Sequence, residues 1–275
     1  MGLIVIQNVM ADSGYISANL TQAQLHFMHL LDENEVELFS FSDIENQLGS
    51  KFENLNEVLE NLVKKKILSR LERGKYCRST FKDENAIGCF LVPNGAISYW
   101  SALNKHGLTE QFPNIIYIQT ASQKRNAEVL GVRYKFVRVK VKKITGLQKE
   151  GYGSRSYRIT DIEKTIVDCF DLPEHSGGIA ELIRALNTAK LNTEKMINYC
   201  EAIDNISAIK RMGFLIELLD KQGLKSFVKF AKQKVNSRYN LFDPFGEEKG
   251  EFVNDWRLRL NISRDEILDI CNKQY

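Results

Sequence analysis

The side chains of this sequence that could perform chemistry are mainly cationic, and they suit the binding of phosphate groups. Between positions 64 and 78, seven basic side chains stand against Glu72 alone, a net charge of +6. Between positions 121 and 158, eleven basic side chains stand against two acidic ones, a net charge of +9. Each phosphate that a lysine or arginine neutralises releases condensed counterions, which favours binding. The two basic regions therefore indicate a polyanionic partner, although the whole chain of 275 residues carries a net charge of only +3.

The candidate contacts with DNA are the basic and amide side chains of these regions and of the helix before the first one. The first set is Lys51, Asn54, Asn61, Lys64, Lys65, Arg70, Arg73, Lys75 and Arg78. The second set is Lys124, Arg125, Arg133, Lys135, Arg138, Lys140, Lys142, Lys143, Arg155 and Arg158. An ordinary solvated surface is the alternative, but a surface with so few acids repels itself, and a polyanion relieves that repulsion.

Residues suited to catalysis are few, and each has a simpler structural explanation. Asp161 and Glu163 fall in the first turn of an expected helix, where acids favour the cap and the helix dipole. Asp243, Glu247 and Lys249 loosely resemble a metal-nuclease set, but they crowd one loop, whereas a metal site needs ligands that converge from separate elements. No glycine-rich phosphate loop, nucleophile elbow or zinc signature occurs. We expect no catalytic residue, no cofactor and no metal.

Cysteine and histidine spacing also argues against a metal site. The five cysteines are widely spaced and form no Cys-x-x-Cys pair, which favours reduced thiols in a cytoplasmic protein. His26 and His29 lie one helical turn apart without a third ligand. The apolar run at positions 2–6 is too short to span a bilayer, so we expect no membrane partner.

The first basic region lies at the end of an expected winged helix-turn-helix. Ser42 and Glu45 have capping-box spacing and Gly49 supplies a left-handed stop, which predicts a short helix. Apolar residues at helical spacing over 55–63 predict a second helix, and the turn at 72–75 predicts a hairpin. The exposed face of the second helix also carries three acids, at positions 53, 57 and 60, which phosphates repel. A winged helix used for protein contacts is the alternative.

The second basic region lies in a separate domain. A polar stretch at 80–86 predicts the boundary, a strand is expected at 115–118, and another at 132–141. The phase of alternation changes along that second strand, which predicts a bulge near Phe136 and Val137 that keeps its charges on one face. Amphipathic helices follow from position 160, and a late strand over 256–262 is expected to return to the same sheet.

These patterns predict an α+β protein of two domains. Residues 1–80 form an N-terminal winged helix-turn-helix. Residues 86–275 form a C-terminal α/β domain in which a small sheet is packed on one side by a helical bundle.

Residues Tyr99–Pro113 resemble the "SALxxHGLTEQ" segment of AbiEi-type antitoxins, the transcriptional regulators of type IV toxin–antitoxin systems. Further landmarks of that family appear in the expected order, and the resemblance covers most of the chain. They are Arg73–Tyr76, Gly131–Phe136, Asp161–Thr165 and Trp256–Asn261.

The resemblance implies a non-enzymatic repressor of the kind found in phage abortive infection systems. Its winged domain and the basic face of its C-terminal domain would bind inverted repeats of double-stranded DNA in the promoter of its own operon. Two-fold repeats imply two copies of the chain, a homodimer on DNA. The operon would also encode a nucleotidyltransferase-type toxin that the antitoxin counteracts. In this interpretation Ser101, His106 and Glu110 are landmarks of the fold rather than catalysts.

Two other functions remain open at this level. The chain could be a protein-interaction module whose basic C-terminal face docks on an acidic partner. It could also be a metal-dependent nuclease that uses Asp243 or Glu247.

Overall fold

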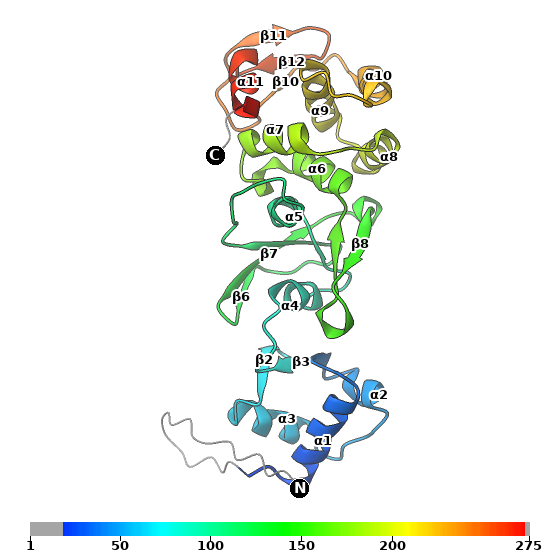
Figure 1. Cartoon of the computed structure of the whole chain (residues 1–275), viewed down its shortest axis with the longest axis vertical. Helices are drawn as coiled ribbons and strands as arrows, with labels where there is room; N and C mark the ends of the chain where they lie inside the picture. Colours follow the sequence, from blue (N-terminus) through cyan, green and yellow to red (C-terminus); the bar gives the residue numbers. More distant parts are fainter. Residues whose placement is uncertain (1–18, 273–275) are drawn as a thin grey trace. The chain divides into compact units, whose positions relative to one another are not determined.

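Contacts within the chain divide it into two units, which the computed structural model describes over residues 19–272 (Figure 1). The first unit ends at Lys82 and the second begins at Asp83, inside the polar stretch expected to hold the boundary. That stretch already begins a helix, because the Asp83 carboxylate accepts a hydrogen bond from the Ala86 amide at 2.9 Å and caps α4 (Glu84–Phe90). The second unit therefore begins at Asp83 rather than at position 86.

Over residues 19–82, the N-terminal unit contains three helices and one small antiparallel sheet. Its elements are α1 (Gln22–Glu33), β1 (Leu38–Ser40), α2 (Ile44–Leu48), α3 (Leu55–Lys64), β2 (Leu68–Glu72) and β3 (Lys75–Arg78). The strand order is β1-β3-β2, with both pairs antiparallel. This order of elements is the one a winged helix-turn-helix requires, and the assignment of the unit to that class stays a prediction.

One apolar cluster holds these elements together. Phe27 and Leu31 of α1 pack with Phe39 of β1 and Leu59 of α3, all fully buried. Burying a side chain of this size contributes about 1.5–3 kcal/mol. The left-handed stop at Gly49 is confirmed by its φ of 60°.

The predicted capping box at the start of α2 is wrong. The residue before the helix is Asp43 rather than Ser42, and its side chain caps no amide. The Glu45 carboxylate instead accepts a hydrogen bond from the Phe52 amide at 2.8 Å. Glu45 therefore ties α2 to the loop before α3, a contact between segments that local spacing does not reveal.

The C-terminal unit is built on a mixed six-stranded sheet. Its strands, in spatial order, are β6 (Ala127–Val129), β7 (Val132–Arg138), β5 (Ile116–Thr120), β4 (Ala96–Ile97), β9 (Tyr157–Thr160) and β8 (Leu147–Glu150). Helices α5 (Tyr99–Lys105) and α6 (Ile162–Asp171) contact one another, and α5 contacts β5. Helix α4 also packs closely on β5 and β7 at Gly88, which has no side chain. A Cβ at this position would lie only 2.5 Å from the Ile118 side chain of β5 and 2.6 Å from the Tyr134 ring of β7.

The bulge predicted in β7 is wrong. This strand pairs with β5 in parallel without a register shift, from Ile116 opposite Tyr134 to Thr120 opposite Arg138. Its basic residues consequently lie on both sides of the sheet, Arg133 and Lys135 on one side and Arg138 on the other. The change in apolar phase has another cause: Phe136 and Val137 are consecutive and both buried, so neither side of β7 is left to solvent there.

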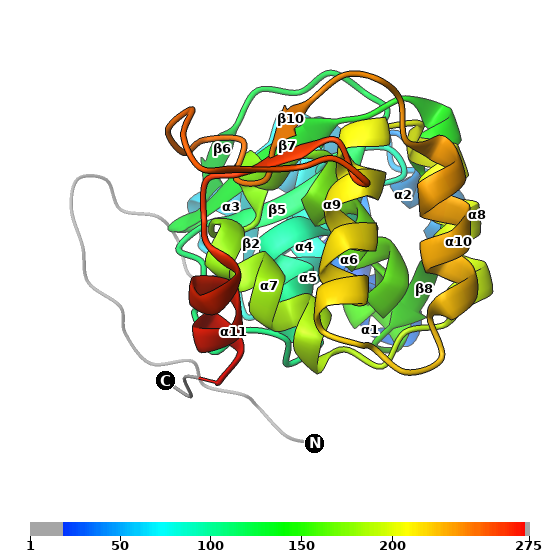
Figure 2. The same cartoon turned by 90° about the horizontal axis from the view of Figure 1, so that it is seen from above.

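The rest of the unit consists of helices and a second sheet. The helices are α7 (Ile179–Thr188), α8 (Thr193–Ile203), α9 (Ile206–Leu218), α10 (Lys225–Lys234) and α11 (Arg264–Asn272), and α9 and α10 lie side by side (Figure 2). Short 3-10 helices occur at Val141–Lys143, Gly153–Arg155 and Pro173–His175. The second sheet has the order β10 (Asn240–Leu241), β12 (Leu258–Leu260) and β11 (Glu251–Val253).

The sequence predicted that the late strand returns to the six-stranded sheet, and this prediction is wrong. β12 pairs in parallel with β10 and antiparallel with β11, and these three strands form a sheet of their own. In Figure 1 this sheet and the six-stranded sheet lie at opposite ends of the C-terminal unit, with helices between them. The α+β class is confirmed, with two sheets rather than one in the C-terminal unit. In the described range 19–272, no helix combines the length and apolar character needed to cross a bilayer.

Candidate nucleic-acid interface

The hairpin of the N-terminal unit exposes two arginines. β2 and β3 join through Gly74, whose φ of 75° lies in the left-handed region that favours glycine. Arg70 and Arg73 are exposed and have no ion-pair or hydrogen-bond partner within residues 19–272. Lys75 lies 3.0 Å from the Glu72 carboxylate, which neutralises part of the local charge. Arg70 and Arg73 are therefore the side chains of this hairpin best placed to reach a phosphate.

Two basic residues of the predicted set are instead used inside the N-terminal unit. The Lys65 ammonium donates to the Asn19 carbonyl at 2.6 Å and to the Gln24 side chain at 2.9 Å. Arg78 forms an ion pair with Asp32 at 2.6 Å and donates to the Val36 carbonyl at 3.2 Å. These contacts join α3 and β3 to the region of α1, so both side chains serve the fold.

The exposed face of α3 is acidic. Glu53, just before the helix, and Glu57 and Glu60 within it are exposed, and the Asn56 amide donates to Glu60 at 3.3 Å. Four predicted DNA contacts lie on this helix or just before it. Three of them are exposed, namely Lys51, Asn54 and Lys64, and Asn61 is half-buried. Carboxylates next to a phosphate backbone are unfavourable, so this face is poorly suited to lie along DNA.

The basic side chains of the six-stranded sheet divide into two groups. Four of them make contacts within the unit. Lys124 donates to the Leu91 carbonyl at 3.0 Å, Lys135 lies over the Tyr117 ring, Lys143 pairs with Asp171 at 2.6 Å, and Arg158 donates to Asn94 at 3.3 Å.

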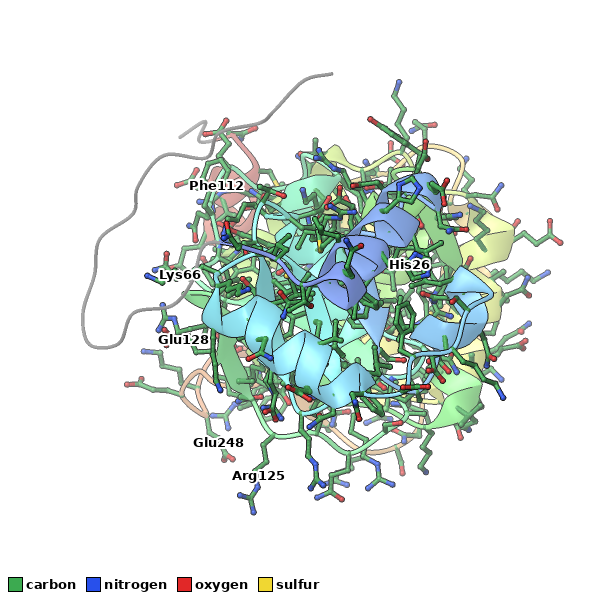
Figure 3. The ribbon with its side chains drawn as sticks, turned by 90° about the horizontal axis from the view of Figure 1, so that it is seen from below. His26, Lys66, Phe112, Arg125, Glu128 and Glu248 are labelled. Atoms are coloured by element: carbon green, nitrogen blue, oxygen red, sulfur yellow. The ribbon has the colours of Figure 1, made fainter. Side chains whose placement is uncertain are left out.

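The second group is exposed. Arg125, Arg133, Lys140 and Arg155 have no ion-pair or hydrogen-bond partner in the described part of the chain, and Figure 3 shows Arg125 pointing away from the ribbon. Arg138 and Lys142 are also exposed, although Arg138 donates to the Ala121 carbonyl and Lys142 lies 3.5 Å from Asp204. The exposed charges are therefore fewer than the sequence count suggests.

One groove gathers basic residues from distant parts of the C-terminal unit. It has a volume of about 610 Å³ and lies between the end of β7, the start of α9 and the segment after α10. Its basic lining residues are Arg138, Lys140, Lys142, Lys143 and Arg238, against the acids Asp171 and Asp204. We call this hollow the basic groove.

The start of α9 contributes polar groups to the basic groove. The side-chain oxygen Oδ1 of Asn205 accepts hydrogen bonds from the backbone amides of Ser207 and Ala208, at 3.1 and 3.3 Å. Its amide nitrogen donates to Asp171 at 2.9 Å. Helix N-termini favour anions, so this end of α9 adds to the positive character of the groove.

Sequence reasoning missed Arg238 and the start of α9 as parts of this site. Arg238 is about one hundred residues from Arg138 in the chain, as their numbers show, and a single basic residue gives no local charge signal. No pattern within either segment indicates that the two meet.

The catalytic candidates are held by structural contacts. Asp161 caps α6 by accepting from the Lys164 amide at 2.8 Å, and it also accepts from Tyr199 at 2.8 Å and from Lys195 at 3.0 Å. Asp243 accepts from the Phe245 amide at 3.0 Å, and Glu247 pairs with Lys249 at 2.7 Å. Within residues 19–272 there is no group of three His, Cys, Asp or Glu side chains placed to hold a metal ion.

The segment that resembles the AbiEi-type antitoxins makes contacts that stabilise the fold. His106 donates to the Thr160 carbonyl at 2.7 Å, and Ser101 accepts from the Tyr117 amide at 2.9 Å. Thr109 donates to the buried carboxylate of Glu181. Glu110 is exposed. These contacts attach the segment to β5, β9 and α7.

The fold defines a class of two-unit α+β proteins rather than an activity. Across 94% of this chain and 97% of the other, the structure is similar to the crystal structure of the RV2827C protein from Mycobacterium tuberculosis, with a TM-score of 0.61 and 13% sequence identity. At this identity the likeness extends to the fold alone. No family model matches the sequence, and no curated protein matches it.

Proposed function

We propose that this protein is a DNA-binding antitoxin and transcriptional autorepressor of a type IV toxin–antitoxin operon. The observation that supports DNA binding most strongly is the basic groove, in which five cations face two acids. A phosphate backbone relieves the repulsion among such cations and releases counterions. The proposed partner is double-stranded DNA carrying inverted repeats, bound by two copies of the chain in the cytoplasm.

The proposed contact set is narrower than the set read from the sequence. In the N-terminal unit it consists of Arg70 and Arg73, supported by their exposure and lack of partners among the described residues. In the C-terminal unit it consists of the basic groove with Arg125, Arg133 and Arg155. Lys65 and Arg78 leave the set because they make contacts within their own unit.

The antitoxin role rests on the sequence resemblance. It requires a nucleotidyltransferase-type toxin encoded in the same operon. The toxin expressed alone should arrest growth, and co-expression of this protein should restore it. No restoration would remove the antitoxin role and leave DNA binding to be judged separately.

DNA binding is tested with a labelled duplex that carries the upstream region of the protein's own gene. Fluorescence anisotropy at several salt concentrations gives the affinity and its salt slope. Replacing Lys140 and Arg238 with Ala together should lower that slope by about 1.8, since each lost phosphate contact is worth about 0.9. Lys190→Ala serves as a control at an exposed lysine outside the groove lining. An unchanged slope would remove the groove from the interface.

A protein-interaction module remains the second candidate function. The acidic face of α3 favours it, because exposed carboxylates suit a basic protein surface better than a phosphate backbone. It predicts a protein partner that stays bound after nuclease treatment.

A further inference from the structure

Lys210 is a buried cation on α9 that no carboxylate neutralises. Its side chain is 0% exposed, and it has no ion-pair partner within residues 19–272. Burying an ammonium group is costly unless other groups satisfy it. Lys210 therefore has to be held by neutral polar atoms.

Three oxygen atoms from two segments accept hydrogen bonds from this ammonium. They are the Arg238 carbonyl at 2.7 Å, the Arg257 carbonyl at 3.2 Å and the side-chain oxygen of Asn236 at 3.4 Å. Asn236 and Arg238 lie between α10 and β10, and Arg257 lies in the turn between β11 and β12. The three acceptors match the three N–H groups of an ammonium, so Lys210 joins both segments to α9.

The segment before β10 that Lys210 holds is also a wall of the basic groove. Asn236, Arg238 and Asn240 line the groove. Residues 236–239 have no regular secondary structure, and in the described part of the chain their amides donate no backbone hydrogen bond. The first such bond is that of the Asn240 amide, which donates to the Arg257 carbonyl at 3.1 Å. The position of Arg238 in the groove therefore depends on contacts such as the one its carbonyl makes with Lys210.

The charged groups that face Lys210 are cations. Arg211 follows it on α9, Arg238 lies in the segment before β10, and Arg257 lies in the turn before β12. Burial and these three guanidinium groups lower the pKa of Lys210 from 10.5 to about 8. A rise in pH above about 8 therefore removes its proton.

We propose that Lys210 is a positioning residue of the basic groove, which holds Arg238 where it can contact a phosphate. The proposal rests on the proposed binding of duplex DNA in that groove. A charged donor makes hydrogen bonds about twice as strong as those of a neutral one. Loss of the Lys210 proton should therefore loosen the segment and weaken DNA binding, although Lys210 itself is not exposed to the ligand.

The first test measures the binding of the full chain to the labelled duplex of its own upstream region by fluorescence anisotropy. Lys210→Met removes the charge and should lower the salt slope by up to about 0.9, the value of one phosphate contact. The double variant with Arg238→Ala should have the slope of Arg238→Ala alone, because both changes remove the same contact. An unchanged slope in Lys210→Met, or additive effects in the double variant, would overturn the proposal.

Lys221→Met is the matched control. Lys221 is half-buried and donates to the Asn187 and Ala189 carbonyls, at 2.5 and 3.1 Å. It lies outside the groove lining, so its replacement should leave the slope unchanged. A thermal melt confirms that each variant is folded. An equal loss of slope in Lys221→Met would reveal a general effect on the fold and would count against a specific role of Lys210.

A pH series separates positioning from simple support of the fold. A rise of the Lys210 pKa by one unit on DNA binding would make the affinity of the wild type about fivefold weaker at pH 9 than at pH 7. Lys210→Met has no ammonium at this position and should lose that dependence. Parallel pH profiles of the two proteins would contradict the proposal.

Amide hydrogen exchange tests the same role without DNA. The Asn240 amide shares the Arg257 carbonyl with Lys210, so it should exchange about threefold faster or more in Lys210→Met than in the wild type. If Arg238→Ala binds the duplex as tightly as the wild type does, the proposed function of the groove fails. The exchange rate then decides the positioning of the segment alone, and an unchanged rate at Asn240 would overturn it.

Discussion

The guanidinium of Arg78 lies 2.6 Å from the carboxylate of Asp32, and this pair joins β3 to α1. The Arg78 side chain is 16% exposed, whereas that of Asp32 is 67% exposed. A residue at the end of a basic hairpin thus turns toward its own unit. Position within a charged run is therefore a poor guide to which cations are free to bind DNA.

We expect Arg78→Met to lower the free energy of unfolding by about 1 kcal/mol. Because Asp32 is exposed, its ion pair with Arg78 contributes little to the free energy of unfolding. Loss of the hydrogen bond from Arg78 to the Val36 carbonyl adds to the destabilisation. Urea unfolding measures it. Arg73→Met is the matched control and should change stability by less than about 0.5 kcal/mol, because Arg73 is exposed. Equal effects of the two substitutions would contradict the structural role of Arg78.

Replacing Arg70 and Arg73 with Ala together should flatten the salt dependence of duplex binding. Two lost phosphate contacts reduce the slope of log affinity against log salt by about 1.8. Anisotropy titrations between low and physiological salt measure that slope. If it stays the same while the protein remains folded, the hairpin does not touch DNA.

Replacing Glu57 and Glu60 with Gln should leave duplex affinity within about twofold, since the proposed contacts are the hairpin and the groove. The two carboxylates are exposed on α3. If α3 instead lay against phosphates, removing two acids would raise affinity by about tenfold, or roughly 1.4 kcal/mol. A gain of that size would place α3 at the DNA.

Glu181→Ala should destabilise the C-terminal unit without a selective effect on nucleic-acid binding. Glu181 is 2% exposed, accepts from Thr109 and pairs with Arg184 at 2.6 Å. Removing one partner of a buried charged network costs about 3–5 kcal/mol. Thermal unfolding should therefore shift strongly. The mutation Glu194→Ala, at an exposed acid in the first turn of α8, provides the comparison. A fully stable Glu181→Ala protein would refute this role.

The buried pair of Lys164 and Asp168 should make stability depend on pH. Burial raises the pKa of Asp168 from 3.8 to about 6, despite the nearby Lys164. The folded state then holds a proton that the unfolded state releases, so stability falls as pH rises from about 4 to about 6. The decrease from this group is on the order of 2–3 kcal/mol. Unfolding free energies of the wild type and Asp168→Asn across pH 4–7 test this.

The wild type and Asp168→Asn should differ in how steeply their unfolding free energies change with pH, as well as in the unfolding free energies themselves. Asp168→Asn removes the titrating group, so its unfolding free energy should fall less steeply over that pH range. Parallel curves would show that Asp168 does not titrate there.

Local sequence pattern was sufficient wherever a side chain's environment follows from its neighbours along the chain. The apolar spacing in α3 placed Leu55, Val58, Leu59 and Leu62 in the core, and all four are buried. Ser263 and Glu266 have the spacing of a capping box and form one: the Ser263 amide donates to the Glu266 carboxylate at 2.7 Å, and the Ser263 hydroxyl accepts from the Glu266 amide at 3.2 Å. Alternation predicted a strand over 256–262, and the structure forms its central part as β12, with Leu258 and Leu260 buried.

The sequence by itself determined helices such as α3, strands such as β5 and β7, and the α+β class, because helical and strand periodicities are properties of consecutive residues. Tertiary structure alone decided which strands share a sheet and which cations remain exposed. β12 shows the difference: its alternation identifies a strand, but pairing with β10 and β11 depends on the path of the chain between them. The basic groove has the same origin, since Arg138 and Arg238 meet only when α9 and β10 pack beside β7.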